Sequence, residues 1–108
     1  MTMSDAELER ATLPVLLASW ARIVDVVARG DMSPDEFQRD VRVRHEIAKR
    51  IRSRPATAET RELLAELDGW MREATEPTSA CALGAEQAER EGWTPSLQWY
   101  YWIGLRNA

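Results

Sequence analysis

One segment of the sequence, residues 13–29 (LPVLLASWARIVDVVAR), constrains the possible folds more than any other. On a helix its side chains are apolar around most of the circumference, and only Arg22, Asp25 and Arg29 form a narrow polar strip. A helix that is apolar nearly all round is buried, either in a protein core or in a membrane. Arg22 and Asp25 interrupt the apolar run, which falls short of the roughly 20 residues that a membrane-spanning helix needs. We therefore expect the central helix of a folded core and no membrane span.

Two further long helices are predicted from their start and stop signals. Ser33 is followed by a proline and, three positions later, by Glu36, a combination typical of a helix start. Pro55 disfavours helical geometry at the residue before it, so this helix is expected to span 34–53. A third helix is expected over 58–74, capped by the preceding threonine. Its apolar residues share one narrow stripe, as in a surface helix packed on a core: Leu63, Leu64, Leu67, Trp70, Met71 and Ala74.

The remaining segments are shorter. Ser4 and Glu7 have the spacing of a capping box, so a short helix is expected up to about residue 11. A helix over about 80–91 contains mostly small residues and is expected to end at Gly92. Because no repeat, low-complexity run or long linker interrupts the chain, we expect one domain over residues 1–108. The predicted fold class is all-α: a compact bundle of four to five helices around the buried central helix, with an aromatic C-terminal helix.

Residues 93–108, the aromatic tail, hold five of the eight aromatic residues of the chain: Trp93, Trp99, Tyr100, Tyr101 and Trp102. On a helix these rings would point in every direction, and one core face cannot absorb them all. On a strand they would have better propensity, but a single strand needs an edge to pair with, for example in a partner. The simpler interpretation is a terminal helix that covers the central helix.

Exposed rings in this tail are a candidate binding surface, because Trp and Tyr dominate interface energetics. We expect Tyr101 and Trp102 to lie at the surface, and Trp99 and Ile103 to point inward. A closed monomer and a protein with a partner on this surface are both compatible with the pattern.

Arg44 is predicted in the middle of an apolar helix stripe, which is formed by Phe37, Val41, Ala48 and Ile51. A charge in such a position is costly unless it is paired. Asp40, four residues earlier, and Asp25, on the central helix, are the candidate partners. If it is paired with one of these aspartates, Arg44 forms a structural ion pair. The alternative is that its guanidinium lines a small pocket that receives an anion.

Charge is distributed unevenly along the chain, whose net charge is −4. Residues 39–54 hold seven Lys/Arg against two carboxylates, a local balance of +5, so the rest of the chain carries −9. Clustered basic residues are how proteins neutralise phosphates, but the pI is near 5.0 and no helix-turn-helix is recognisable. Pairing with the acidic face of helix 58–74 explains the charges as well, so nucleic acid is not the expected partner: that face holds Glu59, Glu62, Glu66 and Glu73.

Little in the sequence indicates catalysis or metal binding. His45 is the only histidine and Cys81 the only cysteine, and nothing in their positions brings them together. The acidic face of helix 58–74 lacks the Glu-x-x-His spacing of metal sites in helix bundles. The sequence also lacks a glycine-rich phosphate loop, zinc-type spacing and a nucleophile elbow. We therefore expect a protein that is not an enzyme and that has neither cofactor nor metal.

Two function classes remain. The first is a small non-catalytic protein–protein interaction module (an accessory subunit, an inhibitor or an immunity-type protein) that binds a protein partner or a second copy through the aromatic tail. The second is a small-molecule-binding sensor domain, with a pocket lined by Trp20, Trp70 and tail aromatics and with Arg44 as its anchor. The start of the chain, MTMSDAELER, lacks the apolar run of a secretion signal, and a lone cysteine forms no internal disulfide, so a cytoplasmic protein is expected.

Overall fold

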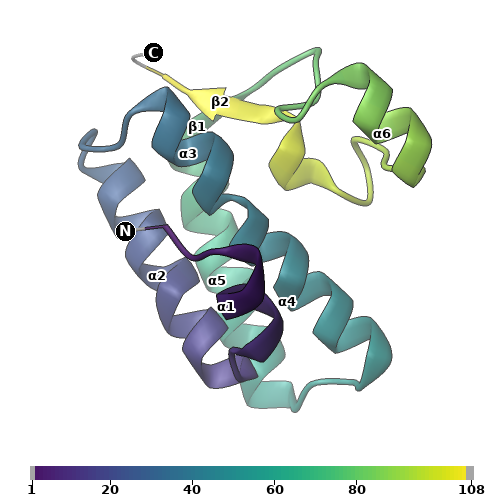
Figure 1. Ribbon diagram of the computed structural model, residues 1–108. Coiled ribbons are helices and arrows are strands. Elements are labelled where there is room, and N and C mark those ends of the chain that lie inside the picture. Colours follow the sequence, from purple (N-terminus) through teal and green to yellow (C-terminus); the bar gives the residue numbers. More distant parts are fainter. Residues whose placement is uncertain (1, 107–108) are drawn as a thin grey trace.

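A computed structural model describes residues 2–106 (Figure 1). Five α-helices come first, and a small two-stranded sheet and a sixth helix follow them. The helices are α1 (Asp5–Arg10), α2 (Leu13–Ala28), α3 (Pro34–Asp40), α4 (Arg42–Ser53), α5 (Ala58–Ala74) and α6 (Ala85–Glu91). The strands are β1 (Thr75–Pro77) and β2 (Ile103–Leu105), and a short 3₁₀ helix, η1 (Trp99–Tyr101), precedes β2. In Figure 1, α2 and α5 run in the same direction, α4 runs opposite to both, and the sheet lies beyond the end of α5.

The helix starts follow the capping signals of the sequence. Ser4 and Ser33 each form a complete capping box with the glutamate three positions later, so α1 and α3 begin as predicted. The hydroxyls of Thr12 and Thr57 accept hydrogen bonds from the first turns of α2 and α5. These starts are confirmed because the signals are local and depend on few neighbours.

Helix α2 contributes more buried side chains to the core than any other helix, as predicted, but only one side of it is buried, because Val15 is 49% exposed. Its inward side chains contribute much of the core: Leu16, Leu17, Trp20, Ile23, Val24 and Val27. It packs chiefly against α4 and α5 rather than against the aromatic tail, so the expectation that a terminal helix covers it is wrong. The stripe of α5 is also narrower than predicted, because Leu63 and Trp70 are half-exposed. Within residues 2–106, no helix is long and apolar enough to cross a membrane.

The helix predicted over 34–53 is instead two helices that meet at Val41. The amide of Arg44 bonds to the carbonyl of Val41, three residues earlier, at 3.1 Å, which tightens the chain into a 3₁₀-like turn. The side chain of Arg42 donates to the carbonyl of Arg39 at 3.0 Å and satisfies one of the groups at the end of α3. Val41 itself is fully buried at the junction.

Helix α6 begins later than predicted, at Ala85 rather than near residue 80. Gly84 has a φ of 97°, which glycine adopts readily and other residues rarely do, and its amide bonds to the carbonyl of Cys81 at 3.0 Å. Residues 81–84 therefore form a turn. The predicted end of this helix at Gly92 is confirmed.

The aromatic tail is neither the predicted helix nor a strand in need of a partner. Its residues form a loop, η1 and β2, and β2 pairs with β1 of the same chain in antiparallel register, with Glu76 opposite Gly104. Pro77 has no N–H group to donate to the neighbouring strand. It stands at the last position of β1, where the missing hydrogen bond disturbs the strand pairing least. The fold is therefore mostly helical with a small sheet. Residues 1, 107 and 108, which the predicted domain and last helix included, lie outside the described residues.

Candidate functional site

The 3₁₀ helix η1 divides the aromatic tail between the core and the surface. A 3₁₀ helix has three residues per turn, so side chains three positions apart lie on the same side. Trp99 and Trp102 share the outer side and are partly exposed, whereas Tyr100 and Tyr101 turn inward and are each 1% exposed. The expectation that Tyr101 lies at the surface is wrong, and Trp99, which was expected to point inward, is only partly buried. Ile103 is buried and Trp102 is partly exposed, as expected.

The inward rings hold the tail against α4. The Tyr100 hydroxyl and the His45 Nδ1 share a hydrogen bond of 2.7 Å. Tyr101 stacks on Trp93 with ring centroids 4.5 Å apart, and the edge of the His45 ring meets Trp93 at 5.1 Å. Burial raises the pKa of Tyr100 to about 12, so its hydroxyl stays protonated at neutral pH. The role of these three rings is therefore structural: Tyr100, Tyr101 and Trp93 anchor the tail to α4.

This packing predicts a pH dependence of stability through His45. Burial, followed by the nearby charges of Lys49 and Arg52, lowers the pKa of His45 below its usual 6.5. Between the folded and the unfolded pKa, the unfolded chain binds more protons, so the free energy of unfolding rises with pH across that window. We expect the urea midpoint to fall as pH drops below 6.5 towards the folded pKa. His45→Gln should remove this dependence; an unchanged pH profile in that variant would exclude His45 as its source.

Arg44 forms the central ion pair of the helical core. Its Nε and Nη2 donate to the two carboxylate oxygens of Asp68 on α5, each at 3.0 Å. The indole Nε1 of Trp20, on α2, donates to the same carboxylate at 3.1 Å. The guanidinium also lies 5.4 Å from the centroid of the Tyr100 ring. One carboxylate thus joins α2, α4 and α5, and Arg44 links this network to the tail.

The predicted partners of Arg44 were wrong, although an ion pair between two helices is what the structure has. Asp40 is buried and accepts a hydrogen bond from the Thr2 hydroxyl at 2.8 Å. Asp25 pairs with Arg29, one turn along α2, at the surface. The signal that could have found the true partner is Asp68 itself, because this carboxylate falls within the apolar stripe of α5 just as Arg44 falls within that of α4.

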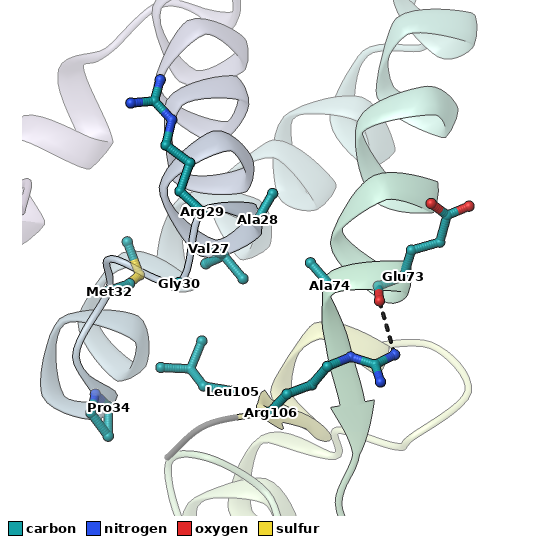
Figure 2. A pocket seen from close by; sticks show the side chains of 10 residues that line it. All are labelled: Val27, Ala28, Arg29, Gly30, Met32, Pro34, Glu73, Ala74, Leu105 and Arg106. Carbon is teal, nitrogen blue, oxygen red and sulfur yellow. Dashed lines mark hydrogen bonds between the residues drawn. The ribbon is translucent and has the colours of Figure 1, made fainter.

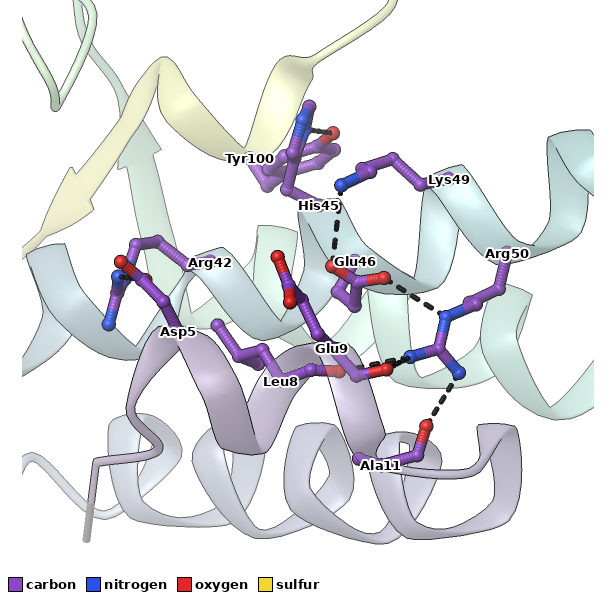
Figure 3. A network of polar contacts seen from close by, with 10 residues as sticks. All are labelled: Asp5, Leu8, Glu9, Ala11, Arg42, His45, Glu46, Lys49, Arg50 and Tyr100. Atoms are coloured by element: carbon purple, nitrogen blue, oxygen red, sulfur yellow. Dashed lines mark hydrogen bonds and ion pairs between the residues drawn. The ribbon is translucent and has the colours of Figure 1, made fainter.

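Several other charges of the basic segment 39–54 hold the N-terminal helix in place (Figure 3). Arg50 donates to three carbonyl oxygens at the end of α1, those of Leu8, Glu9 and Ala11. Its Nε also donates to Glu46 at 3.0 Å, and Arg42 pairs with Asp5. Cations at a helix C-terminus satisfy carbonyls that have no partner in the helix. These contacts within the protein explain much of the positive charge of residues 39–54, so the charge does not require a nucleic-acid partner.

The outward rings of the tail line a groove of about 350 Å³, the tail groove. Its walls combine the two tryptophans with prolines, the strand β1 and the end of α5: Arg72, Thr75, Glu76, Pro77, Thr78, Pro95, Trp99, Trp102 and Ile103. The guanidinium of Arg72 lies 4.2 Å from the centroid of the Trp99 ring, a cation–π distance. The tail groove is therefore aromatic and apolar, with one charge of each sign in its lining.

The two indole N–H groups of the tail groove differ from its threonine hydroxyls, which donate to backbone carbonyl groups. Within residues 2–106, neither the Trp99 nor the Trp102 indole N–H donates a hydrogen bond inside the protein. No buried side-chain nitrogen or oxygen in this part of the chain lacks a partner, so both indole N–H groups reach solvent. Two fixed donors on an apolar surface are the polar groups that orient a ligand in such a groove.

A second pocket, of about 310 Å³, lies where α2 and α5 end beside β2 (Figure 2). Val27, Met32 and Leu105 point into it, while the Arg29 guanidinium and the Glu73 carboxylate point away from each other. Arg106 donates to the carbonyl of Glu73 at 2.9 Å. Because its polar groups do not converge on a common point, this pocket is a weaker candidate than the tail groove.

The structure separates the six residues predicted to bind. Trp99 and Trp102 meet in the tail groove, Tyr100 and Tyr101 are buried, Trp93 is partly exposed and stacks on Tyr101, and Arg44 belongs to the core network. Arg44 borders a cavity lined by aliphatic and charged side chains, and neither Trp20, which is fully buried, nor Trp70 is part of that lining.

Sequence reasoning missed Arg72 and Pro77 as groove residues, since the pairing of β1 with β2 brings this part of the chain to the tail, and it also missed Pro95 within the tail itself. Within residues 2–106, no group of three or more His, Cys, Asp or Glu side chains is placed to hold a metal ion. No family model matches the sequence, no curated protein matches it, and no solved structure matches the fold.

Proposed function

We propose that this protein is a small non-catalytic interaction protein that binds an extended, proline-containing segment of a partner protein in the tail groove. The observation that carries the proposal is the pair of partly exposed tryptophans, Trp99 and Trp102, whose rings line one groove and whose indole N–H groups are free. Folding leaves these two large aromatic side chains partly exposed at the edge of the core and buries the two tyrosines between them. Such side chains are the ones that dominate binding energy at interfaces.

The chemistry of the groove favours proline over other apolar segments. A polyproline II segment has no internal hydrogen bonds, and its carbonyl groups point outward while proline offers no N–H. The groove matches this with donors, the indole N–H groups of Trp99 and Trp102, and with flat aromatic faces against which proline rings pack. Glu76, in the same lining, supports pairing with a basic residue of the segment.

The size of the groove supports a segment rather than a globular partner. A volume of about 350 Å³ is at the small end of ligand pockets, which are typically about 300–1,000 Å³. A stable interface between two folded proteins buries about 800 Å² on each partner. The preformed geometry of a polyproline II segment lowers the entropy cost of ordering it, which matters for a small contact.

Selection from a phage-displayed library of random peptides tests this proposal. We expect the wild-type protein to enrich proline-containing peptides, and Trp102→Ser to weaken their binding about 30-fold, corresponding to about 2 kcal/mol for an interface tryptophan. Trp70→Ser is the matched control, because Trp70 is 50% exposed on α5 and lies outside the groove.

Three results would contradict the proposal. The library could give no enriched peptide, or peptides whose binding is equally weakened by Trp70→Ser. Self-association of the wild-type protein in sedimentation experiments, abolished by Trp102→Ser, would instead show that a second copy fills the groove. Circular dichroism of each variant establishes that the fold is retained.

We also propose a cytoplasmic location. The one cysteine of the chain, Cys81, is buried as a free thiol in the core. Disulfide-free proteins are typical of reducing compartments. Export of the protein to the periplasm or the medium, detected after cell fractionation, would contradict this location.

A further inference from the structure

A cavity of about 400 Å³ between α4 and the first half of α5, the arginine cavity, carries charge that the fold does not use. It shares no lining residue with the tail groove. Its lining combines three arginines, one aspartate and four aliphatic side chains: Arg44, Arg52, Arg61, Asp68, Ala48, Ile51, Leu64 and Ala65. The two helices run in opposite directions, and a short loop joins the end of α4 to the beginning of α5 (Figure 1).

The three guanidinium groups differ in how they are partnered. The charge of Arg44 is compensated by Asp68 through two hydrogen bonds. Arg61 donates only to the backbone carbonyl of Ala56, at 2.7 Å, and Arg52 has neither a hydrogen bond nor an ion pair; both statements refer to residues 2–106. Two arginines therefore bring an uncompensated charge of +2 to the lining of one cavity.

The rest of the lining is apolar. Ala48 and Ile51 from α4, with Leu64 and Ala65 from α5, line the same open hollow as these arginines. Arginine binds carboxylate and phosphate oxygens through paired N–H donors, and such charge-assisted bonds are stronger than neutral ones. An apolar wall beside an arginine pair is complementary to a molecule with an oxyanion at one end and a hydrocarbon body at the other.

We infer that the arginine cavity binds a small organic anion, with its carboxylate or phosphate between Arg52 and Arg61 and its apolar body against Ile51 and Leu64. A nucleic-acid strand fits the surroundings less well. The neighbouring turns of α5 expose Glu59, Glu62 and Glu66, and Lys49 on α4 is already paired with Glu46. These carboxylates would repel a chain of phosphates that extends beyond the cavity.

Titrations followed by ¹H–¹⁵N NMR spectra test the inference with three probes: phenyl phosphate, benzoate and the neutral benzyl alcohol. We expect phenyl phosphate to cause saturable shifts in the amides around Ile51 and Leu64, and benzoate to cause weaker shifts at the same positions. Arg52→Gln and Arg61→Gln should each weaken phenyl phosphate about tenfold, the loss of one charge-assisted contact. Benzyl alcohol should cause no saturable shift there.

Arg54→Gln is the matched control, because Arg54 is exposed beside the end of α4 but does not line the cavity. Arg52, Arg54 and Arg61 are exposed, so these three variants are expected to fold, and wild-type-like spectra of the free proteins would verify this. Equal weakening by Arg54→Gln, saturable shifts only in the tail groove, or no saturable shift at all would overturn the inference. Tighter binding of oligothymidylate than of phenyl phosphate would also overturn it, in favour of nucleic acid.

Discussion

Replacing Asp68 with alanine is expected to lower the free energy of unfolding by about 3 kcal/mol, because it removes one partner of a largely buried ion pair and leaves the other uncompensated. The side chains of Arg44 and Asp68 are only 11% and 15% exposed. The substitution also removes the acceptor of the Trp20 indole N–H, and Trp20 is fully buried at the centre of α2. Urea denaturation, with the midpoint and the slope fitted separately, measures this loss.

The matched control is Asp25→Ala, which removes an aspartate–arginine pair at the surface. The side chains of Asp25 and Arg29 are 54% and 66% exposed, so their separation should cost less than about 1 kcal/mol. If Asp68→Ala lost no more stability than Asp25→Ala, the carboxylate would not be the link between α2, α4 and α5. The burial of Arg44 would then not depend on its ion pair with Asp68.

Replacing Tyr101 with alanine should lower the free energy of unfolding by about 4 kcal/mol, within the range for truncating a buried aromatic residue. Its ring is 1% exposed, stacks on Trp93 and lies 4.9 Å from the Tyr100 ring, centroid to centroid. The cavity left behind would loosen the contact of the tail with α4, including that of His45. Thermal and urea unfolding followed by far-ultraviolet circular dichroism measure the effect.

Trp102→Ala is the control for the predicted loss of stability in Tyr101→Ala. The larger ring of Trp102 is partly exposed on the outer side of η1, so its removal should cost about 1 kcal/mol, well below the cost at Tyr101. Equal losses at the two positions would mean that the tail is buried uniformly. The division of the aromatic tail into core and surface would then be wrong.

The parts of the fold that could be predicted from sequence are those with local causes. The capping boxes at Ser4 and Ser33 determine helix starts through contacts that span three residues. The many apolar residues of segment 13–29 predicted a core helix, and six side chains on one side of α2 are buried in the core. The split at Val41 was missed because the sequence there contains neither glycine nor proline, and the helix turns through a change in hydrogen bonding alone.

The candidate site depended on contacts between distant parts of the chain. Sequence reasoning identified the tail aromatics, but which rings face outward depends on η1 and on the pairing of β2 with β1. A helix, a strand and a 3₁₀ turn each place Tyr101 on a different side, and propensity alone does not decide among them. In the same way, the match of Arg44 with Asp68 follows from the packing of α4 and α5 against the same helix, α2.

The most direct test of the tail groove uses the five indole N–H signals of the protein in ¹H–¹⁵N spectra, titrated with a synthetic peptide of six prolines followed by one arginine. We predict saturable shifts of the Trp99 and Trp102 signals, whose N–H groups are free. The Trp20 signal should not move, because its N–H is bonded to Asp68 at 3.1 Å. Shifts that are largest at Trp70 or Trp93, or signals that do not move at any peptide concentration, would contradict a proline-binding groove between Trp99 and Trp102.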